Sequence, residues 1–237
     1  MKLFDFIILL FLSGCATKYI LPGNRFITPE TQGSIFRGQM EYQQAGATQL
    51  TIDTSNGTVE DGVLNEDVIR SGFLMSNSLF DSFDFVWSHT GGSASMLGGK
   101  YQFLGGSRSG NAAGPKASIA ILAGGNDYET DDKTIKFNLG GTEYIALYGH
   151  RLNPAVLTYS SFSYATYDFK GTINSSDPVL DGLTPKLQSR LITVSGGMEL
   201  TYSPFMTKLE ASYQQLQTSD SKDKSSFVFG YSFGFNW

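Results

Sequence analysis

The last eleven residues of the chain, 227–237, read FVFGYSFGFNW. Aromatic residues occupy every second position of this stretch, and small, polar or short apolar residues stand between them. A period of two is typical of a β-strand, because successive side chains of a strand point to opposite faces of a sheet. A tilted strand needs roughly 9–11 residues to cross a bilayer. The stretch therefore predicts a strand whose aromatic face is compatible with lipid.

A terminal aromatic residue preceded by alternating aromatic residues resembles the C-terminal insertion signal of bacterial outer-membrane β-barrel proteins. The residues that carry this likeness are Tyr231, Phe233, Phe235 and Trp237. The resemblance implies an all-β fold, a transmembrane antiparallel up-and-down barrel, over residues 34–237. It also implies that the barrel-assembly machinery recognises the chain and that outer-membrane lipids contact the barrel. It identifies no specific family.

Five further segments alternate in the same way, namely 82–91, 94–104, 116–126, 190–202 and 206–217. In each of them the charged residues share the face opposite the large apolar residues. This arrangement is expected when one face meets lipid and the other faces a polar interior. Together with two neighbouring segments they give our candidates for the lumen, which are Arg70, Asp84, Lys100, Lys116, Lys136, Glu199, Lys208 and Glu210.

The segment 134–149 is harder to assign. Ile135, Phe137 and Leu139 share one face, but the same alternation would then put Glu143 into lipid. We expect a β-bulge at residues 140–141 to reverse the faces, since a bulge inserts one extra residue into a strand. The tyrosines at 144 and 148 would then point outward.

Two other segments are also ambiguous. Both faces of 155–169 carry aromatic residues, and we expect Leu157, Tyr159, Tyr167 and Phe169 to point outward. Residues 34–54 form either one long bulged strand or an unpaired lead-in followed by a strand near 47–54. Residues 67–79 form the next strand.

The connections between the expected strands alternate in length. Residues 79–82, 150–154 and 203–206 are short turns, whereas 55–66, 127–133, 170–188 and 218–225 are longer and polar. Outer-membrane barrels place short turns at the periplasm and long loops outside. The Gly/Ser-rich stretch 105–115 is the exception, because it falls among the short turns. The count reaches ten strands, with eight and twelve as alternatives.

The first fifteen residues have the layout of a secretory signal, with Lys2, a short apolar run and a small-residue site. Leu12 to Cys15 reads LSGC, which is similar to the bacterial lipoprotein signal. The resemblance implies cleavage after residue 14 and acylation of Cys15, for example by palmitate. Residues 15–33 would then be a lipidated N-terminal segment. Ala16 after the cysteine implies the outer membrane, and we expect the lipid on the periplasmic side.

Composition excludes several classes of protein. The formal net charge is −5, and 16% of the residues are charged, so the chain is not a basic nucleic-acid binder. Aromatic residues reach 14%, which excludes intrinsic disorder. A single cysteine excludes an intramolecular disulfide.

Few residues carry catalytic chemistry. His89 lies next to Ser88 and near Ser93, as a serine hydrolase of lipids would require, but the local sequence matches no barrel lipase motif. We interpret His89 as an interfacial residue beside aromatic neighbours, and His150 as structural. The acids at 127, 129, 131 and 132 fit no metal-binding loop that we can name. We therefore expect no enzyme, metal or cofactor.

Two functions remain. The first is a small porin-like pore or passive transport protein, because the interior face carries charges of both signs. The second is a non-conducting structural or interaction barrel, which could assemble as a homo-oligomer. Interior charges that pair with one another would close the lumen, whereas unpaired charges would line a water path. The length excludes a general porin of about 16 strands.

Overall fold

The structure is a computed structural model. It describes residues 16–53, 60–110, 112–129, 135–173, 181–182, 184, 186–219 and 223–237. The strands are β1 Ala16–Pro22, β2 Gly38–Asp53, β3 Glu60–Phe80, β4 Phe83–Thr90, β5 Ser95–Leu104, β6 Gly114–Glu129, β7 Ile135–Asn153, β8 Val156–Ile173, β9 Lys186–Tyr202, β10 Phe205–Thr218 and β11 Lys224–Asn236. One 3₁₀ turn, η1, spans Arg108–Gly110. Among the described residues, no helix is long and apolar enough to cross a membrane.

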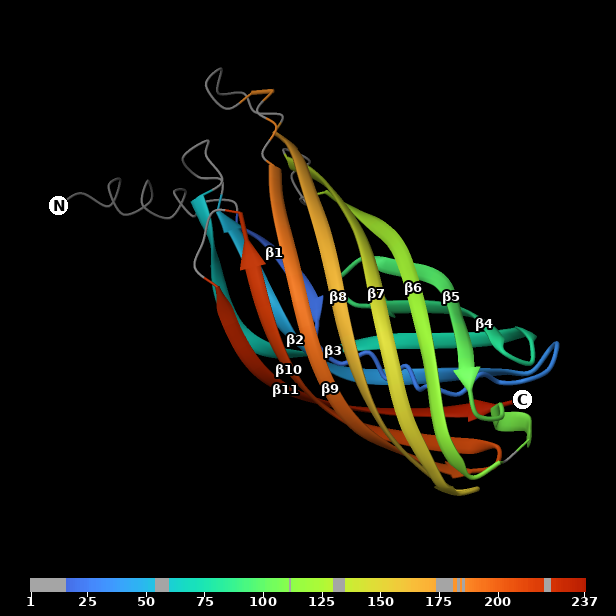
Figure 1. Cartoon of the computed structure of the whole chain (residues 1–237). Helices are drawn as coiled ribbons and strands as arrows, with labels where there is room; N and C mark the ends of the chain where they lie inside the picture. The colour runs from blue at the N-terminus through green and yellow to red at the C-terminus, as the bar shows by residue number, and fades with distance from the viewer. Residues whose placement is uncertain are drawn as a thin grey trace.

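The strands from β2 to β11 form a closed antiparallel barrel (Figure 1). Each strand pairs with the next along the chain, and β11 closes the ring by pairing with β2. The predicted all-β barrel of ten strands is confirmed. Over this stretch, residues 231–236 against 39–44, closure pairs the backbone groups that an open sheet would expose at its two edges.

The wall alternates between exposed apolar and buried side chains. The six aromatic residues of the alternating set, five on β11 and Trp237 directly after it, are all exposed, whereas Val228 and Ser232 are buried. On β10 the same holds for exposed Leu209 and Tyr213 and for buried Lys208. The outside of the barrel therefore carries an apolar surface, and the inside is covered.

The two ends of the barrel differ. The turns 81–82, 154–155 and 203–204 lie at the same end as Trp237, and we call this the turn end. At the other end, the loop end, β2 ends and β3 begins, and the same is true of the pairs β6 and β7, β8 and β9, and β10 and β11. The tight β4–β5 connection, residues 91–94, lies partway along the wall, because Thr90 pairs with Gly72 and β3 continues from there to Glu60. The predicted alternation is otherwise present, with 105–113 as the exception at the turn end.

Strand β2 is one long bulged strand, the first of the two predicted alternatives, with register shifts against β3 after Thr48 and Thr51. It also changes partner on its other edge. Residues 39–44 pair with β11, whereas residues 47–53 pair with β1. The change occurs at Gly46, where a Cβ atom would lie 2.6 Å from the carbonyl oxygen of Phe229. Strand β1 thus replaces β11 beside the second half of β2 and runs inside the barrel.

The predicted bulge in β7 is wrong. The register of β7 against β6 runs without a shift from Glu129–Lys136 to Gly114–Arg151. Phe137 and Leu139 are buried, and the same face continues to Glu143. Tyr144 and Tyr148 are exposed, as expected, but they reach the outside by unbroken alternation.

The faces predicted for β8 are also wrong. The four residues expected outside are all buried, namely Leu157, Tyr159, Tyr167 and Phe169. The reason is the strand inside the barrel. Tyr19 of β1 packs against Tyr167 and Phe169 with ring centroids 6.2 Å apart in both cases, so these rings have an apolar partner within the lumen.

The start of the described chain lies at the opposite end from Trp237. Ala16 pairs with Asp53 at the loop end, whereas Trp237 exchanges backbone hydrogen bonds with Gly38 at the turn end. The first and the last described residues therefore lie at opposite ends of the barrel. Cys15 and the predicted signal peptide lie outside the described residues.

Candidate functional site

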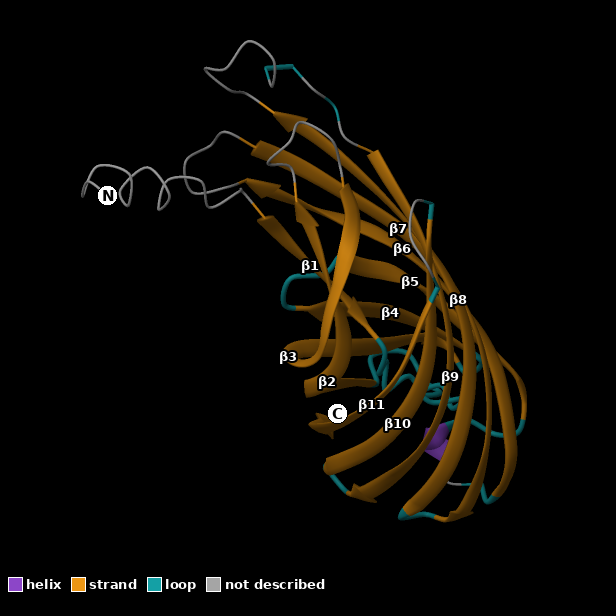
Figure 2. Cartoon of the chain, turned by 90° about the vertical axis from the view of Figure 1, so that its left-hand side faces the viewer, coloured by secondary structure: helices purple, strands orange, loops and turns teal. Residues whose placement is uncertain are grey.

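The most distinctive feature of the molecule is a stretch of chain inside the barrel. Residues 23–33, here called the lumen segment, follow β1 and lead to the turn end. Every residue from 19 to 33 is buried. Figure 2 shows loop segments, in teal, enclosed by the strands. The sequence of this segment, GNRFITPETQG, is largely polar, so its burial requires partners on the wall.

Arg25 is held in the middle of the lumen. Its guanidinium lies 2.9 Å from the Glu143 carboxylate and donates a hydrogen bond of 2.7 Å to the hydroxyl of Tyr167. Both partners point inward from the wall, from β7 and β8. An ion pair with an added hydrogen bond offsets the cost of removing the charge from water.

Glu210 of β10 holds the same part of the segment through its backbone. Its carboxylate accepts hydrogen bonds from the amides of Arg25 and Phe26, at 2.9 and 3.0 Å. It also accepts one from the hydroxyl of Tyr159, at 2.9 Å. Phe26 has a positive φ of 56°, which is unusual for a bulky residue and is imposed here by contacts on both sides.

Glu30 is held nearer the turn end. Its carboxylate lies 2.5 Å from the guanidinium of Arg151 and 3.4 Å from the Lys116 ammonium. Arg151 also contacts Glu199, at 3.1 Å. The acid of the segment therefore contacts two basic wall residues, and one of them, Arg151, also binds Glu199.

The other wall charges pair with each other. Lys208 lies 2.5 Å from Glu41 and 3.8 Å from Glu199. Lys100 lies 3.1 Å from Asp84. All five side chains are buried. Buried charges that are paired in this way form a network, and removing one member leaves another without its partner.

The connection 105–113 covers the lumen at the turn end. The amide of Arg108 donates to the carbonyl of Thr31 at 2.9 Å, and its guanidinium lies 2.6 Å from Glu199. This contact explains why a long connection lies among short turns. It folds onto the lumen segment instead of joining two strands directly.

Toward the loop end the interior is apolar. Phe137 and Phe169 pack with ring centroids 4.6 Å apart, and Tyr19 joins them from β1. Leu21 and Leu122 belong to one buried hydrophobic cluster with Tyr19. A polar interior was expected along the whole barrel, but this half is a packed apolar core with β1 at its centre.

Most of the predicted lumen candidates lie inside. Six of them are buried on the wall, namely Asp84, Lys100, Lys116, Glu199, Lys208 and Glu210. Arg70 is half-buried and donates a hydrogen bond of 3.0 Å to Gln49.

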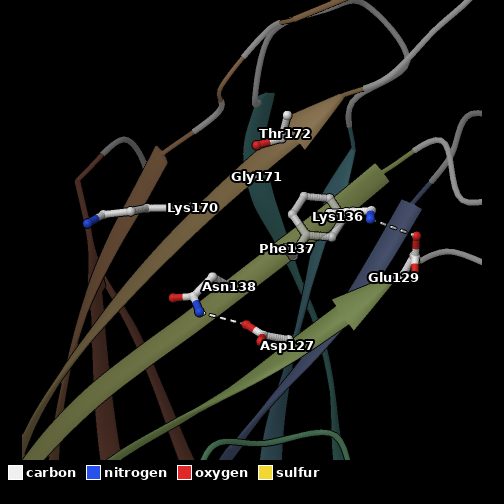
Figure 3. Close-up of a pocket in the computed structure, with 8 residues that line it drawn as sticks. All are labelled: Asp127, Glu129, Lys136, Phe137, Asn138, Lys170, Gly171 and Thr172. Carbon is white, nitrogen blue, oxygen red and sulfur yellow. Dashed lines mark hydrogen bonds and ion pairs between the residues drawn. The ribbon is translucent and has the colours of Figure 1, made fainter.

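Lys136 is the exception, and its assignment to the lumen is corrected. Its side chain is 61% exposed and lies 3.3 Å from Glu129 on the outer side of the wall. The cause is the unbroken alternation of β7, which turns Phe137 inward and therefore Lys136 outward. Figure 3 shows this pair in a polar hollow of about 490 Å³ near the loop end.

The acids of that hollow already have partners. Asp127 accepts a hydrogen bond of 2.6 Å from Asn138, beside the Glu129–Lys136 pair (Figure 3). The acids at 131 and 132 lie outside the described residues. Among the described side chains, no three of His, Cys, Asp or Glu gather to hold a metal ion.

His89 has one feature of a nucleophilic site. Its Nδ1 atom lies 2.8 Å from the Oγ atom of Ser95, and its ring stacks on Trp87 at an interplanar angle of 8°. The partner is thus neither Ser88 nor Ser93. No carboxylate of the described residues bonds to this ring, so the third member of a catalytic triad is missing from that part of the chain.

The residues of the insertion signal lie on the outer face of β11. Tyr231, Phe233 and Phe235 are exposed, and the backbone of Trp237 pairs with Gly38. Trp237 also packs against Phe235, with ring centroids 5.5 Å apart. The last residue therefore takes part in closing the barrel at the turn end.

Several residues of the site were missed by sequence reasoning. They are Arg25, Glu30, Glu41, Arg108, Arg151, Tyr159 and Tyr167. The sequence carried a signal at Glu143. Unbroken alternation places this carboxylate on the same face as Phe137 and Leu139, so a charged partner inside the barrel was to be expected.

Comparison with known proteins gives distant likenesses. No protein-family model and no curated protein matches the chain. Among solved structures, the outer membrane protease OmpT of Escherichia coli is 7% identical over 94% of this chain and 96% of its own, with a TM-score of 0.38. OmpT of Vibrio cholerae, an outer membrane protein, is 13% identical over 95% and 98%, with a TM-score of 0.19. The outer membrane channel DcaP of Acinetobacter baumannii is 9% identical over 94% and 97%, with a TM-score of 0.19. At these values the likeness assigns this chain neither an activity nor a substrate.

Proposed function

We propose that this chain is a bacterial outer-membrane barrel that its own lumen segment closes to ions. It then acts as a non-conducting structural or interaction protein, the second of the two functions expected from the sequence. The observation that carries the proposal is the burial of residues 19–33 inside the ring of strands. A path for hydrated ions needs continuous space along the axis, and the backbone of the segment occupies it.

The outer surface supports the membrane location. Large apolar side chains are exposed on most strands of the wall, and examples are Ile121, Tyr148, Val194, Leu209 and Phe229. Soluble monomers rarely expose contiguous apolar surface on this scale. In a bilayer the same surface is in contact with lipid chains, and strands that pair satisfy one another's backbone groups.

The pairing of the interior charges supports closure over conduction. Lys100 and Lys208 each have a carboxylate partner on the wall, at 3.1 and 2.5 Å. Arg25 and Glu30 of the segment neutralise further wall charges. The porin-like or passive transport function requires the segment to leave, because only then would these wall charges face water.

Lipidation of Cys15 remains part of the proposal and rests on the sequence. A lipid on Cys15 would be attached next to Ala16, which lies at the loop end. Long loops are extracellular in outer-membrane barrels, so this anchor would lie on the outer side of the membrane and not on the periplasmic side. Contacts with the barrel-assembly machinery and with further copies of the chain are proposals of the same kind.

Planar bilayer recording tests the proposed closure. Purified full-length protein that is folded and inserted should give no ion current at any voltage. A variant with Arg25→Glu and Glu30→Arg, which repels Glu143 and Arg151, should give discrete current steps. A stable current through the unmodified protein would refute closure and favour the pore.

A further inference from the structure

The outer surface of the barrel carries a hollow of about 580 Å³ that crosses β9, β10 and β11. These three strands lie side by side in the wall (Figure 2). Gly196 of β9 and Ala211 of β10 are directly opposite each other in this hollow, and both face outward. A Cβ atom at Gly196 would meet no other atom within 4 Å. The hollow exists because two small residues stand where the neighbouring outward positions carry larger ones.

Large apolar side chains protrude beside this hollow. Phe229 of β11 is directly opposite Ala211 and is 64% exposed. Ile69 of β3, which also lines the hollow, is 66% exposed. One patch of the surface therefore holds both a hollow and the side chains that would fill the same hollow in another molecule. An isologous contact requires this, because the same patch of two subunits meets there.

A polar cluster interrupts the apolar surface next to the hollow. Gln44 of β2 and Ser71 of β3 are directly opposite, and the side-chain nitrogen of Gln44 donates to the Ser71 hydroxyl at 2.9 Å. The hydroxyl of Tyr42 donates to Ser71, also at 2.9 Å. The side-chain oxygen of Gln44 accepts no hydrogen bond from the described residues. Exposed Ile69 and Phe73 flank Ser71 on the same face, so lipid chains, which have no hydrogen-bond donors, would surround this oxygen.

The edge of β11 beside the hollow also lacks a strand partner. Residues 231–236 pair with β2, but no described strand pairs with this edge at residues 224–230. In the same register Phe229 would face Gly46. The amide of Gly46 instead donates to the side chain of Asn24 in the lumen segment, at 2.9 Å. Within the described part of the chain, backbone groups next to the hollow are therefore not paired with a strand, which is unfavourable in hydrocarbon.

We propose that this patch, the outward face of β9–β11 together with Gln44 and Ile69, binds a second copy of the chain within the membrane. Phe229 of each copy fills the hollow over Gly196 and Ala211 of the other, and the two polar clusters meet. A lipid chain would fill the hollow but would leave the oxygen of Gln44 and the edge of β11 without donors. The inference rests on the proposed membrane location and names the partner of the interaction barrel. The rest of the outer surface stays in contact with lipid.

Energy transfer between copies in lipid vesicles tests this contact. The full chain with Cys15→Ser and Phe36→Cys is labelled with a donor or an acceptor dye at residue 36, whose side chain is 87% exposed in the structure. The two preparations are reconstituted together in phosphatidylcholine vesicles at a low ratio of protein to lipid. We expect energy transfer between the copies, and we expect it to fall when unlabelled chain is added in excess.

Filling the hollow should separate the copies. Ala211→Trp should raise the dissociation constant in the membrane about 10-fold or more, because the added ring occupies the space that Phe229 of the other copy needs. Ala146→Trp is the matched control, since Ala146 also faces outward but lies on β7, opposite residues of β6 and β8. The control should leave the energy transfer unchanged. Gln44→Leu, which removes the polar group of the patch, should lower the transfer.

Two results would overturn the inference while leaving the proposed function intact. One is the absence of energy transfer between inserted copies that carry no substitution in the patch, since lipid alone then fills the hollow. The other is a transfer that Ala211→Trp and Ala146→Trp change equally, since the copies then meet elsewhere. Chain that does not float with the vesicles would refute the membrane location and the inference with it. The proposed closure is tested separately, by the absence of current through the inserted protein.

Discussion

The guanidinium of Arg25 lies 2.9 Å from the carboxylate of Glu143, although 118 positions separate the two in sequence. Arg25 belongs to the lumen segment and Glu143 to the wall strand β7. Their side chains are 8% and 1% exposed, so water does not replace either partner when the other is lost. The pair therefore ties the N-terminal segment to the barrel.

Replacing Arg25 alone should destabilise the protein. Arg25→Met leaves the Glu143 carboxylate buried without its partner, which costs about 3–5 kcal/mol. The free energy of unfolding in urea, measured in detergent micelles, should fall by this amount. The double variant Arg25→Met with Glu143→Gln should lose much less, because no unpaired charge remains. Losses that simply add in the double variant would show that the two side chains do not interact.

A charged substitution on the outer face of the barrel should cost more free energy of unfolding the deeper it lies in the bilayer. Leu209 is an inner residue of β10, the fifth of its fourteen, opposite Tyr231 and Met198, and is 55% exposed. Leu209→Arg should cost about 2–4 kcal/mol, because the charge is placed among lipid chains. Tyr202→Arg, at the turn-end tip of β9, should cost about 0–1 kcal/mol. Equal costs in unfolding experiments in lipid bilayers would mean that this face does not meet lipid.

The terminal aromatic residue should matter for assembly in cells. Trp237→Ala removes the ring that packs on Phe235 at the closing pair of strands. The folded fraction in isolated membranes, seen as the band that shifts on heating before electrophoresis, should fall. Trp237→Phe keeps an aromatic ring and should restore the band. A folded fraction unchanged by the alanine variant would exclude a role in insertion.

Cys15 should carry the lipid. Cys15→Ser should abolish metabolic labelling by palmitate, because the chain contains no other cysteine. The barrel should still fold, since its strands begin at Gly38. Labelling that persists in this variant would remove the lipoprotein assignment.

The inward and outward faces of a strand could be predicted where one face is apolar and meets lipid and the other is polar and faces the interior. On β10 and β11 the alternation of apolar and small or polar residues is complete, so the faces follow from a period of two. On β8 both faces are apolar, because Tyr167 and Phe169 pack on β1 inside the lumen. Periodicity within β8 cannot distinguish lipid from an apolar core, and the assignment failed there.

The closure of the lumen could not be predicted from local sequence. The segment around Arg25 and Glu30 has the composition of a linker, and its partners lie far along the chain on β7 and β10. Pairing of interior charges was one of two alternatives, and the sequence contained no means of choosing between them. The choice depends on long-range contacts that only the closed ring brings together.

The accessibility of residue 28 tests the central claim most directly. Thr28 is fully buried in the lumen segment, whereas Phe36, just outside it, is 87% exposed. In the Cys15→Ser background, Thr28→Cys in nanodiscs should not react with a water-soluble maleimide, and Phe36→Cys should react within minutes. Both should react after unfolding. A folded Thr28→Cys variant that reacts as fast as Phe36→Cys would contradict closure of the lumen by residues 23–33.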